Sequence, residues 1–429
     1  MFDHTLQTIS RKIKNLPVSI PTILHKNTTR AVGGALLSLR FFRITGALYL
    51  YRPATSANHG NINLLVQEKG TFNTEAEYLF EDKSQFSLYR LNRILTKMLC
   101  NRAYGKKINQ HNYKFHRQNL KRRKLHQSHI LRLFPKDKFN ALITFNFGDG
   151  ETGALVEATK GQLRTVCLHK EGVMCKNLKQ SYLDLLIEHR DKFRGDLMLV
   201  YNDDMKDILL KTGHYIPEMI KVVGAPRFDI IYSLSRKAET PKKHSILAFY
   251  PSPNAQLNSL LGADFDAGFT WKHLCREFQQ TLEILAKKFP NIPLVIKAKH
   301  RDKNSFNQSL LIQKNISFTT ETLAMDLIAS SSICLGFNSA ALIESAAFGL
   351  PTIQCNLGEA MSRRTKDWII DYGSLTHTAE GVKQVMKVSE EILGRPPNRL
   401  KLSEERKVDL IRLVGNADGK AKQRILSYL

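Results

Sequence analysis

From about residue 138 onward, short apolar runs alternate with segments that have the periodicity of amphipathic helices. Strands are expected at residues 141–147, 164–168, 196–201 and 220–223, and again at 245–250, 293–298, 333–336 and 351–354. Helices are expected at residues 153–160, 205–211, 271–288, 325–329, 340–348, 382–393 and 404–414. Alternation at this spacing is typical of parallel sheets with right-handed crossovers. The chain is therefore predicted to be an α/β protein with two doubly wound domains.

The boundaries of these domains follow from the two series. A charged stretch at residues 236–243 separates the series and is expected to be a linker. We expect a basic helical segment at 1–60, a first Rossmann-like domain at 61–235 with a basic helical insertion at 100–135, and a second Rossmann-like domain at 244–429.

Positive charge is concentrated at the start of the chain. The net charge is +25, and the first 130 residues hold 22 Lys and Arg against 6 Asp and Glu. Residues 102–124 contain nine basic residues and no acid, with Tyr104, Tyr113 and Phe115 among them. Such a surface favours anionic partners. Because no nucleic-acid-binding motif accompanies it, we expect an anionic membrane surface rather than nucleic acid, with an ordinary solvated helix face as the alternative.

The cysteines and the apolar segments indicate in which cellular compartment the protein is expected. None of the six cysteines forms a CxxC pair, so a disulfide framework or a zinc site is not expected and a reducing cytosol fits. No signal peptide is recognisable. The apolar stretch at residues 31–51 is interrupted by Arg40 and Arg43. This disfavours a spanning helix and leaves an interfacial helix or a helix packed on the core.

The segment at residues 333–351, ICLGFNSAALIESAAFGLP, has the strongest chemical content. Ligands of doubly wound sheets bind beyond the carboxyl ends of the strands, and the cleft between two such domains is the expected site. Here a strand ends at Gly336, and Ser339 is placed to cap the helix that follows. A free helix N-terminus attracts phosphate. An ordinary capped helix is the alternative interpretation.

This segment resembles the donor-binding turn of GT-B glycosyltransferases. It is similar to the N/S-S/T-x-x-x-x-E-x-x-x-x-G-x-P pattern of enzymes that make capsules and teichoic acids, with matches at Asn338, Ser339, Glu344, Gly349 and Pro351. The resemblance implies a GT-B fold with an N-terminal acceptor domain and a C-terminal nucleotide-donor domain. It also implies that Asn338 and Ser339 lie at the donor phosphate and Glu344 near the sugar or the ribose.

Three further stretches follow the same pattern in the same order. Residues 223–229, VGAPRFD, resemble the G-x-P-R-x-D turn that closes the first domain, and residues 415–424 resemble a D-G-x-x-x-x-R ending. Residues 297–300, KAKH, resemble a K/R-x-H-P motif in which Arg301 replaces the proline. The resemblance covers about residues 138–429, and nothing in the first 130 residues contributes to it.

Other donor contacts are expected at the carboxyl ends of neighbouring strands. Lys297 and His300 form a cationic group suited to a diphosphate or phosphodiester. The alternative is that His300 is a surface residue with no role in binding. The turn after residue 250 places Ser252 where related enzymes offer a hydroxyl to the donor phosphate, and a plain loop is the alternative.

The catalytic base is expected from the first domain. Transfer to a hydroxyl requires a carboxylate or histidine to take its proton. Glu171 is the first candidate, with His169 beside it; their turn lies where the teichoic-acid enzymes resemble W-H-G. Asp149 is the second candidate. For each of these residues, a solvated loop position without a catalytic role is the alternative. The run at 202–204, NDD, is interpreted as an N-cap rather than a metal site. The resemblance implies no essential metal and no cofactor.

These observations predict a metal-independent glycosyltransferase or polyol-phosphate transferase. Its donor would be nucleotide-activated, with CMP- or CDP-linked donors favoured by His300. Its acceptor would be a hydroxyl of a surface polysaccharide or a lipid-linked saccharide, reached from the bacterial cytoplasm at the inner membrane. Two alternatives remain: a sugar-nucleotide 2-epimerase-like enzyme on the same fold, and a non-catalytic basic binding protein.

Overall fold

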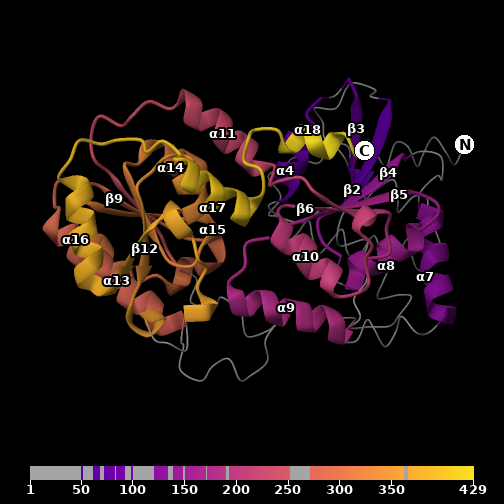
Figure 1. Ribbon diagram of the computed structural model, residues 1–429, viewed down its shortest axis with the longest axis horizontal. Coiled ribbons are helices and arrows are strands. Elements are labelled where there is room, and N and C mark those ends of the chain that lie inside the picture. Colours follow the sequence, from indigo (N-terminus) through magenta and orange to yellow (C-terminus); the bar gives the residue numbers. More distant parts are fainter. Residues whose placement is uncertain are drawn as a thin grey trace, which may run out of the picture.

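The first unit is built on a sheet of seven strands (Figure 1). The computed structural model describes residues 50–51, 61–67, 72–82, 84–91, 98–99, 120–133, 139–147, 150–170, 172–189, 193–251, 271–361 and 366–429. The strand order is β1-β3-β2-β4-β5-β6-β7, and all neighbours are parallel except β1 and β3. The strands are β1 (Leu50–Tyr51), β2 (Ile62–Gln67), β3 (Phe86–Leu91), β4 (Ala141–Thr144), β5 (Arg164–His169), β6 (Leu197–Val200) and β7 (Ile220–Val222).

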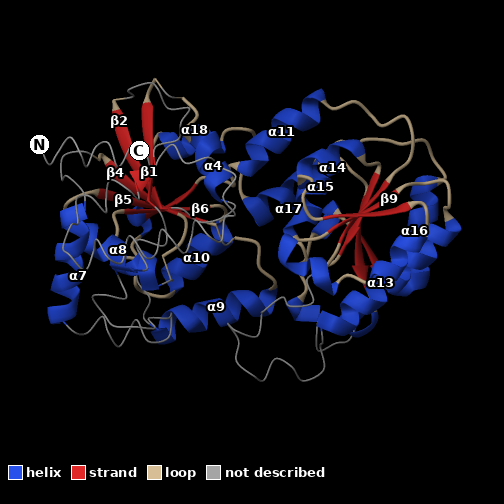
Figure 2. Cartoon of the chain, turned by 180° about the vertical axis from the view of Figure 1, so that it is seen from behind, coloured by secondary structure: helices blue, strands red, loops and turns tan. Residues whose placement is uncertain are grey.

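Helices surround this sheet and join its strands (Figure 2). They are α4 (Phe72–Leu79), α7 (Leu120–Leu133), α8 (Gly150–Thr159), α9 (Lys176–His189), α10 (Asp203–Lys211) and the 3-10 turn η2 (Pro217–Met219). The central strands β4 and β6 are buried along their whole length, as their unbroken apolar sequences require.

The second unit has a six-stranded, entirely parallel sheet in the order β10-β9-β8-β11-β12-β13. Its strands are β8 (Ile246–Phe249), β9 (Leu294–Lys297), β10 (Ile316–Thr319), β11 (Ile333–Gly336), β12 (Thr352–Asn356) and β13 (His377–Glu380). Its helices are α13 (Trp271–Lys288), α14 (Ala324–Ser330), α15 (Ala340–Ala347), α16 (Gly381–Leu393) and α17 (Glu404–Val414). Its 3-10 turns are η4 (His300–Ser305), η5 (Gln308–Ile312), η6 (Gly358–Met361), η7 (Lys366–Trp368) and η8 (Gly373–Leu375).

The strand order of the second sheet places a topological switch point between β8 and β11. Chain connections leave these two neighbouring strands in opposite directions along the sheet, so a crevice for ligands is expected beyond their carboxyl ends. The strand β11 ends at Gly336, directly before α15. The switch point therefore coincides with the segment that the sequence analysis singled out.

The predicted two-domain α/β architecture is confirmed. Each strand and helix expected from residue 138 onward is present, with ends that shift by a few residues. The expectation missed β1, β2, β3, β10, β13, α4, α9, α11 (Arg227–Lys237) and α18 (Ala421–Leu426). The strand β1 also lies within the segment 1–60 that was expected to be helical. Only one residue of β13, Ala379, is buried, so this edge strand lacks the apolar run from which a strand is predicted.

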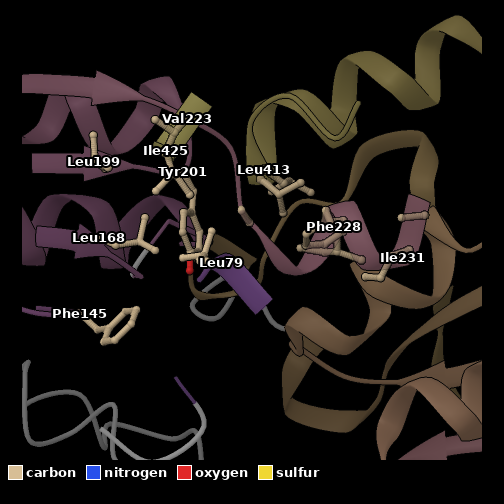
Figure 3. Close-up of a cluster of buried hydrophobic side chains, with 14 of the residues drawn as sticks. Leu79, Phe145, Leu168, Leu199, Tyr201, Val223, Phe228, Ile231, Leu413 and Ile425 are labelled. Carbon is tan, nitrogen blue, oxygen red and sulfur yellow. The ribbon is translucent and has the colours of Figure 1, made fainter. Parts of the chain in front are cut away.

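The chain crosses between the units a second time after α17. The helix α18 (Ala421–Leu426) lies with the first unit, and the C-terminus lies on that side (Figure 1). Its Ile425 belongs to a buried cluster with Val223 and Tyr201 (Figure 3). The same cluster includes Leu247 and Leu342 of the second unit, so apolar packing is continuous across the boundary.

Two of the motifs recognised in the sequence hold this crossing together. Asp229 of the GAPRFD turn accepts hydrogen bonds from the backbone N–H groups of Ala421 and Lys422 at 3.0 and 2.7 Å, and so caps α18. Arg424 donates from Nε to the carbonyl of Val223 at 2.8 Å and pairs with Asp418 at 2.9 Å. The two motifs are therefore structural partners that attach the C-terminal helix to the first unit.

Two expectations on membrane and thiol chemistry can be compared with the described residues. Within that part of the chain, no helix combines the length and the apolar character needed to cross a membrane. The described cysteines, Cys167, Cys175, Cys275, Cys334 and Cys355, are free and buried. The basic run at 102–119 and the apolar stretch at 31–49 lie outside the described residues.

Candidate functional site

The turn between β11 and α15, here called the donor turn (residues 336–341), has an unusual backbone. Asn338 has a φ of 47°, in the left-handed region that non-glycine residues rarely adopt. Its side chain is held at both ends: Oδ1 accepts from the N–H of Ile370 at 2.8 Å, and Nδ2 donates to the carbonyl of Trp368 at 3.3 Å. These bonds offset the strain, and such strain concentrates at functional sites.

Ser339 begins α15 as its N-cap. Its Oγ accepts from the N–H of Ala341 at 3.3 Å, and its carbonyl accepts from the hydroxyl of Tyr372 at 3.0 Å. The predicted capping role is confirmed. Because the first-turn N–H groups of a helix carry partial positive charge and have no partner within the helix, this end can receive an anionic group.

The strain at Asn338 gives a first prediction. Asn338→Ala should lower the free energy of unfolding by about 2 kcal/mol, because alanine adopts the left-handed conformation poorly and loses both side-chain bonds. Asn338→Gly loses the same bonds but tolerates the conformation, so it should cost about 1 kcal/mol less. Urea titration of the three proteins measures the difference. Equal losses in both variants would show that the backbone at this position is not strained.

A second group of polar side chains lies where the two units meet, and is here called the inter-unit cluster: Glu75, Tyr201, Arg227 and Glu344. Nε of Arg227, the first residue of α11, lies 3.3 Å from Oε1 of Glu344 in α15. Oε2 of Glu75 in α4 accepts a hydrogen bond from the hydroxyl of Tyr201 at 3.1 Å. Figure 3 shows that this hydroxyl points toward Leu79 and α4. The cluster thus draws on both units and on the helix that joins them.

Burial sets the acidity of the two carboxyls in this cluster. Desolvation raises the pKa of Glu75, while Arg227, the Tyr201 hydroxyl and Lys170 lower it and Glu344 raises it further. Desolvation also raises the pKa of Glu344, against the opposing charge of Arg227. The charge of Arg227 thus opposes the effect of burial on both carboxyls.

The structure places Lys297 and His300 at the carboxyl end of β9, two strands away from β11 and the donor turn. Lys297 at the end of β9 donates from Nζ to the carbonyl of Thr320 at 2.6 Å, and burial lowers its pKa. His300 is largely exposed, and its Nδ1 lies 2.9 Å from Oε1 of Glu321. Since β8 lies between β9 and β11, about 10 Å separates the end of β9 from the end of β11. Asn338 and Ser339, by contrast, lie directly before α15, and Glu344 lies about one turn into that helix.

Among the predicted catalytic residues, only His169 can be placed. It is fully buried, its ring packs edge-to-face on Phe147 at 5.1 Å, and Nε2 lies 3.4 Å from the hydroxyl of Tyr182. The imidazole is thus covered by aromatic side chains in this conformation. The other candidates, Asp149, Glu171 and Ser252, lie outside the described residues.

The acidic run at 202–204 has the capping role that the sequence suggested. Oδ1 of Asn202 accepts from the N–H of Met205 at 3.1 Å, and Nδ2 donates to the carbonyls of Gly172 and Leu413, each at 2.7 Å. Asn202 therefore caps α10 and fixes the end of α17. In the described part of the chain, no group of three or more His, Cys, Asp or Glu residues is arranged to hold a metal ion.

Sequence reasoning did not find Glu75, Tyr201 or the pairing of Arg227 with Glu344. The motif GAPRFD drew attention to Arg227, and the donor-turn pattern drew attention to Glu344. No motif surrounds Glu75, which lies in a part of the chain where the strand pattern was not recognised. Its burial between units cannot be inferred without the position of α4.

The comparisons with known proteins bear on the fold. Neither the protein-family models nor the curated protein sequences include a match to this chain. Among solved structures, a variant of the wall teichoic acid polymerase TagF matches with a TM-score of 0.52 and 10% identity, covering 94% of this chain and 97% of that one. A UDP-N-acetylglucosamine 2-epimerase matches with a TM-score of 0.51 and 12% identity, covering 86% and 95%.

A third solved structure extends the comparison. The UDP-GlcNAc 2-epimerase from Neisseria meningitidis bound to UDP-GlcNAc matches with a TM-score of 0.50 and 12% identity, covering 85% of this chain and 98% of that one. Similarity at these identities is similarity of fold. The chain has the GT-B fold, as the resemblance implied.

Proposed function

We propose that this chain is a GT-B enzyme that binds a nucleotide-activated sugar at the donor turn and transfers the sugar to a hydroxyl acceptor. The observation that carries the proposal is the position of Ser339 and α15. This capped helix begins at the topological switch point, and the half-buried pair of Glu344 and Arg227 lies about one turn further along. A helix N-terminus beside a guanidinium suits the leaving phosphate of such a donor.

Surface-polysaccharide synthesis is the proposed setting. The similarity in fold to the wall teichoic acid polymerase supports a glycan or lipid-linked acceptor, and the basic first 130 residues would favour the anionic inner face of a bacterial membrane. Residues 297–300, KAKH, resemble the K/R-x-H-P motif and favour a cytidine nucleotide. Polyol-phosphate transfer fits the same geometry.

The alternative is a sugar-nucleotide 2-epimerase. The similarity in fold to the two epimerases supports it, and the buried carboxyls Glu75 and Glu344 could serve proton transfer at a sugar carbon. Incubation with UDP-GlcNAc in deuterated water distinguishes the two. An epimerase gives the 2-epimer with deuterium at the inverted carbon and needs no acceptor, whereas a transferase leaves the configuration at that carbon unchanged.

A nucleotide screen tests the donor site. The melting temperature is measured with CMP, CDP, UDP, GDP and ADP, each with and without Mg²⁺, since a ligand of the native state raises it. We expect one pyrimidine nucleotide to stabilise the protein, and Ser339→Ala to weaken its binding about 10-fold through the loss of a charge-assisted hydrogen bond.

A matched control exists in the same unit. Ser403 also caps a helix, α17, since its Oγ accepts from the N–H of Arg406 at 3.3 Å. Ser403→Ala should therefore lose a cap of similar strength, about 1 kcal/mol, and keep the affinity for the nucleotide. Absence of stabilisation by every nucleotide, or equal weakening by both variants, would count against the donor turn as the binding site.

A further inference from the structure

Glu75 is a carboxylate of the first unit that interacts electrostatically with Glu344 in α15, the helix that follows the donor turn. It projects from α4, is 9% exposed, and lies within electrostatic range of Arg227 and Glu344. No motif pointed to it, and none of the predicted catalytic residues occupies its place. A carboxyl at this depth is costly to ionise, so its presence in a buried inter-unit cluster requires an explanation.

The hydrogen bonding of Glu75 leaves part of the carboxyl available. Oε2 accepts from the hydroxyl of Tyr201, which holds the plane of the carboxyl. This hydrogen bond engages Oε2 and not Oε1. One oxygen is thus fixed by the protein while the other can accept a proton.

The charges around Glu75 come from four different elements. Arg227 begins α11, Glu344 lies in α15, Tyr201 follows β6 and Lys170 follows β5. Burial raises the pKa of Glu75, and two cations and one hydroxyl act against it. A carboxylate whose pKa burial has raised is a stronger proton acceptor than an exposed glutamate.

We propose that Glu75 is the proton acceptor of the reaction at this site. The proposal rests on the proposed function. As the acceptor oxygen forms its bond to the anomeric carbon, the hydroxyl proton passes to Oε1 of Glu75. The bond from that carbon to the donor phosphate breaks, and its electron pair leaves with the nucleotide. Glu75 later returns the proton to solvent. The positive charge of Arg227 offsets the negative charges of the departing phosphate and of Glu344.

The test uses the full chain and the nucleotide that stabilises it. Release of free nucleotide from the corresponding nucleotide sugar, with water as the acceptor, is measured between about pH 5 and pH 9. Glu75→Gln should lower kcat at least about 100-fold while the nucleotide alone binds within about two-fold of its native affinity. Glu77→Gln is the matched control, because Glu77 lies on the same helix, is exposed and pairs with Arg90. This variant should keep the native rate.

A second variant separates proton transfer from a structural role. Tyr201→Phe removes only the hydroxyl that lowers the pKa of Glu75, so that pKa rises. Since the base acts when ionised, the acidic limb of the kcat/KM profile should move to higher pH, by about 0.5–1 pH unit. A residue that only supports the fold would leave the limb in place.

The outcomes are separable. If nucleotide binds and Glu75→Gln turns over at a native rate, or if the limb does not move in Tyr201→Phe, the assignment of Glu75 is overturned while the donor site stands. Native protein that binds a nucleotide yet consumes no donor at any pH also overturns it, since there is then no reaction for Glu75 to serve. Native protein that binds no nucleotide overturns the proposed function and this assignment together.

Discussion

Replacing Gly415 with alanine should lower the free energy of unfolding by about 4 kcal/mol, the largest loss expected from any single methyl group in the described chain. Gly415 ends α17 with φ 76° and ψ −167°, a region that is open almost only to glycine. An alanine Cβ would lie 1.9 Å from the carbonyl oxygen of Tyr201 and 2.9 Å from Cα of Gly224. Backbone atoms of the other unit cannot move aside cheaply, so strain and collision add.

The control for this prediction is Gly213→Ala. Gly213 also has a positive φ, 70°, but its Cβ would meet nothing within 4 Å. Alanine there should cost about 1–2 kcal/mol, from backbone strain alone. Urea titration of the two variants gives the difference, which measures how closely α17 and the first unit approach. If the two losses are equal, the crossing after α17 is looser than the structure shows.

The tail after α17 is a segment whose motif could be recognised in the sequence but whose structural role could not. The tail motif around Asp418 and Arg424 was recognised as a pattern, but its purpose was not. Its purpose depends on a partner almost 200 residues away, since Asp229 caps the helix that the tail forms. Periodicity identifies elements, whereas the pairing of distant turns is a property of the assembled units.

The core of the fold, by contrast, could be predicted well. Parallel strands such as β4, β6 and β11 are buried on both faces and appear in the sequence as unbroken apolar runs. Strands at the sheet edges, such as β10 and β13, bury few residues and were missed. The early strands β2 and β3 are apolar, but they lie in a basic region where no alternation with helices was recognised.

The candidate site was predictable where one local segment carries it. Asn338, Ser339 and Glu344 lie within seven residues of one another, and a local motif exposes them. The conformation of Asn338 was not predictable, because its φ depends on hydrogen bonds from residues 368 and 370. The environment of Glu75 was not predictable for the same reason, because its neighbours come from four separate parts of the chain.

Replacing Arg227 with methionine should lower the free energy of unfolding by about 2–3 kcal/mol near pH 8, and much less near pH 5. The guanidinium is the cation nearest to Glu344 and also lowers the pKa of Glu75. Without it, Glu75 and Glu344 repel each other with no compensating charge from α11. Breaking a buried pair by removing one partner is more costly than removing both.

The direction of the pH dependence follows from the two carboxyls. Burial raises the pKa of each above its ordinary value of 4.5. A carboxyl with a raised pKa in the folded state contributes stability that is complete below the unfolded pKa and is lost as the pH rises through the folded pKa. Loss of Arg227 raises both folded values further. The deficit of Arg227→Met should therefore be small near pH 5 and should grow until both carboxyls are ionised.

A double variant tests whether the deficit comes from the carboxyl left behind. Arg227→Met combined with Glu344→Gln removes both members of the pair, so it should recover at least about 1 kcal/mol of the loss near pH 8 and show a flatter pH dependence. Urea titrations of the single and double variants at the two pH values measure the coupling. Additive losses would mean that Arg227 and Glu344 do not interact in solution. Recovery, in turn, would show that the two units are held together by a charge pair whose strength depends on protonation, at the place where the donor is proposed to bind.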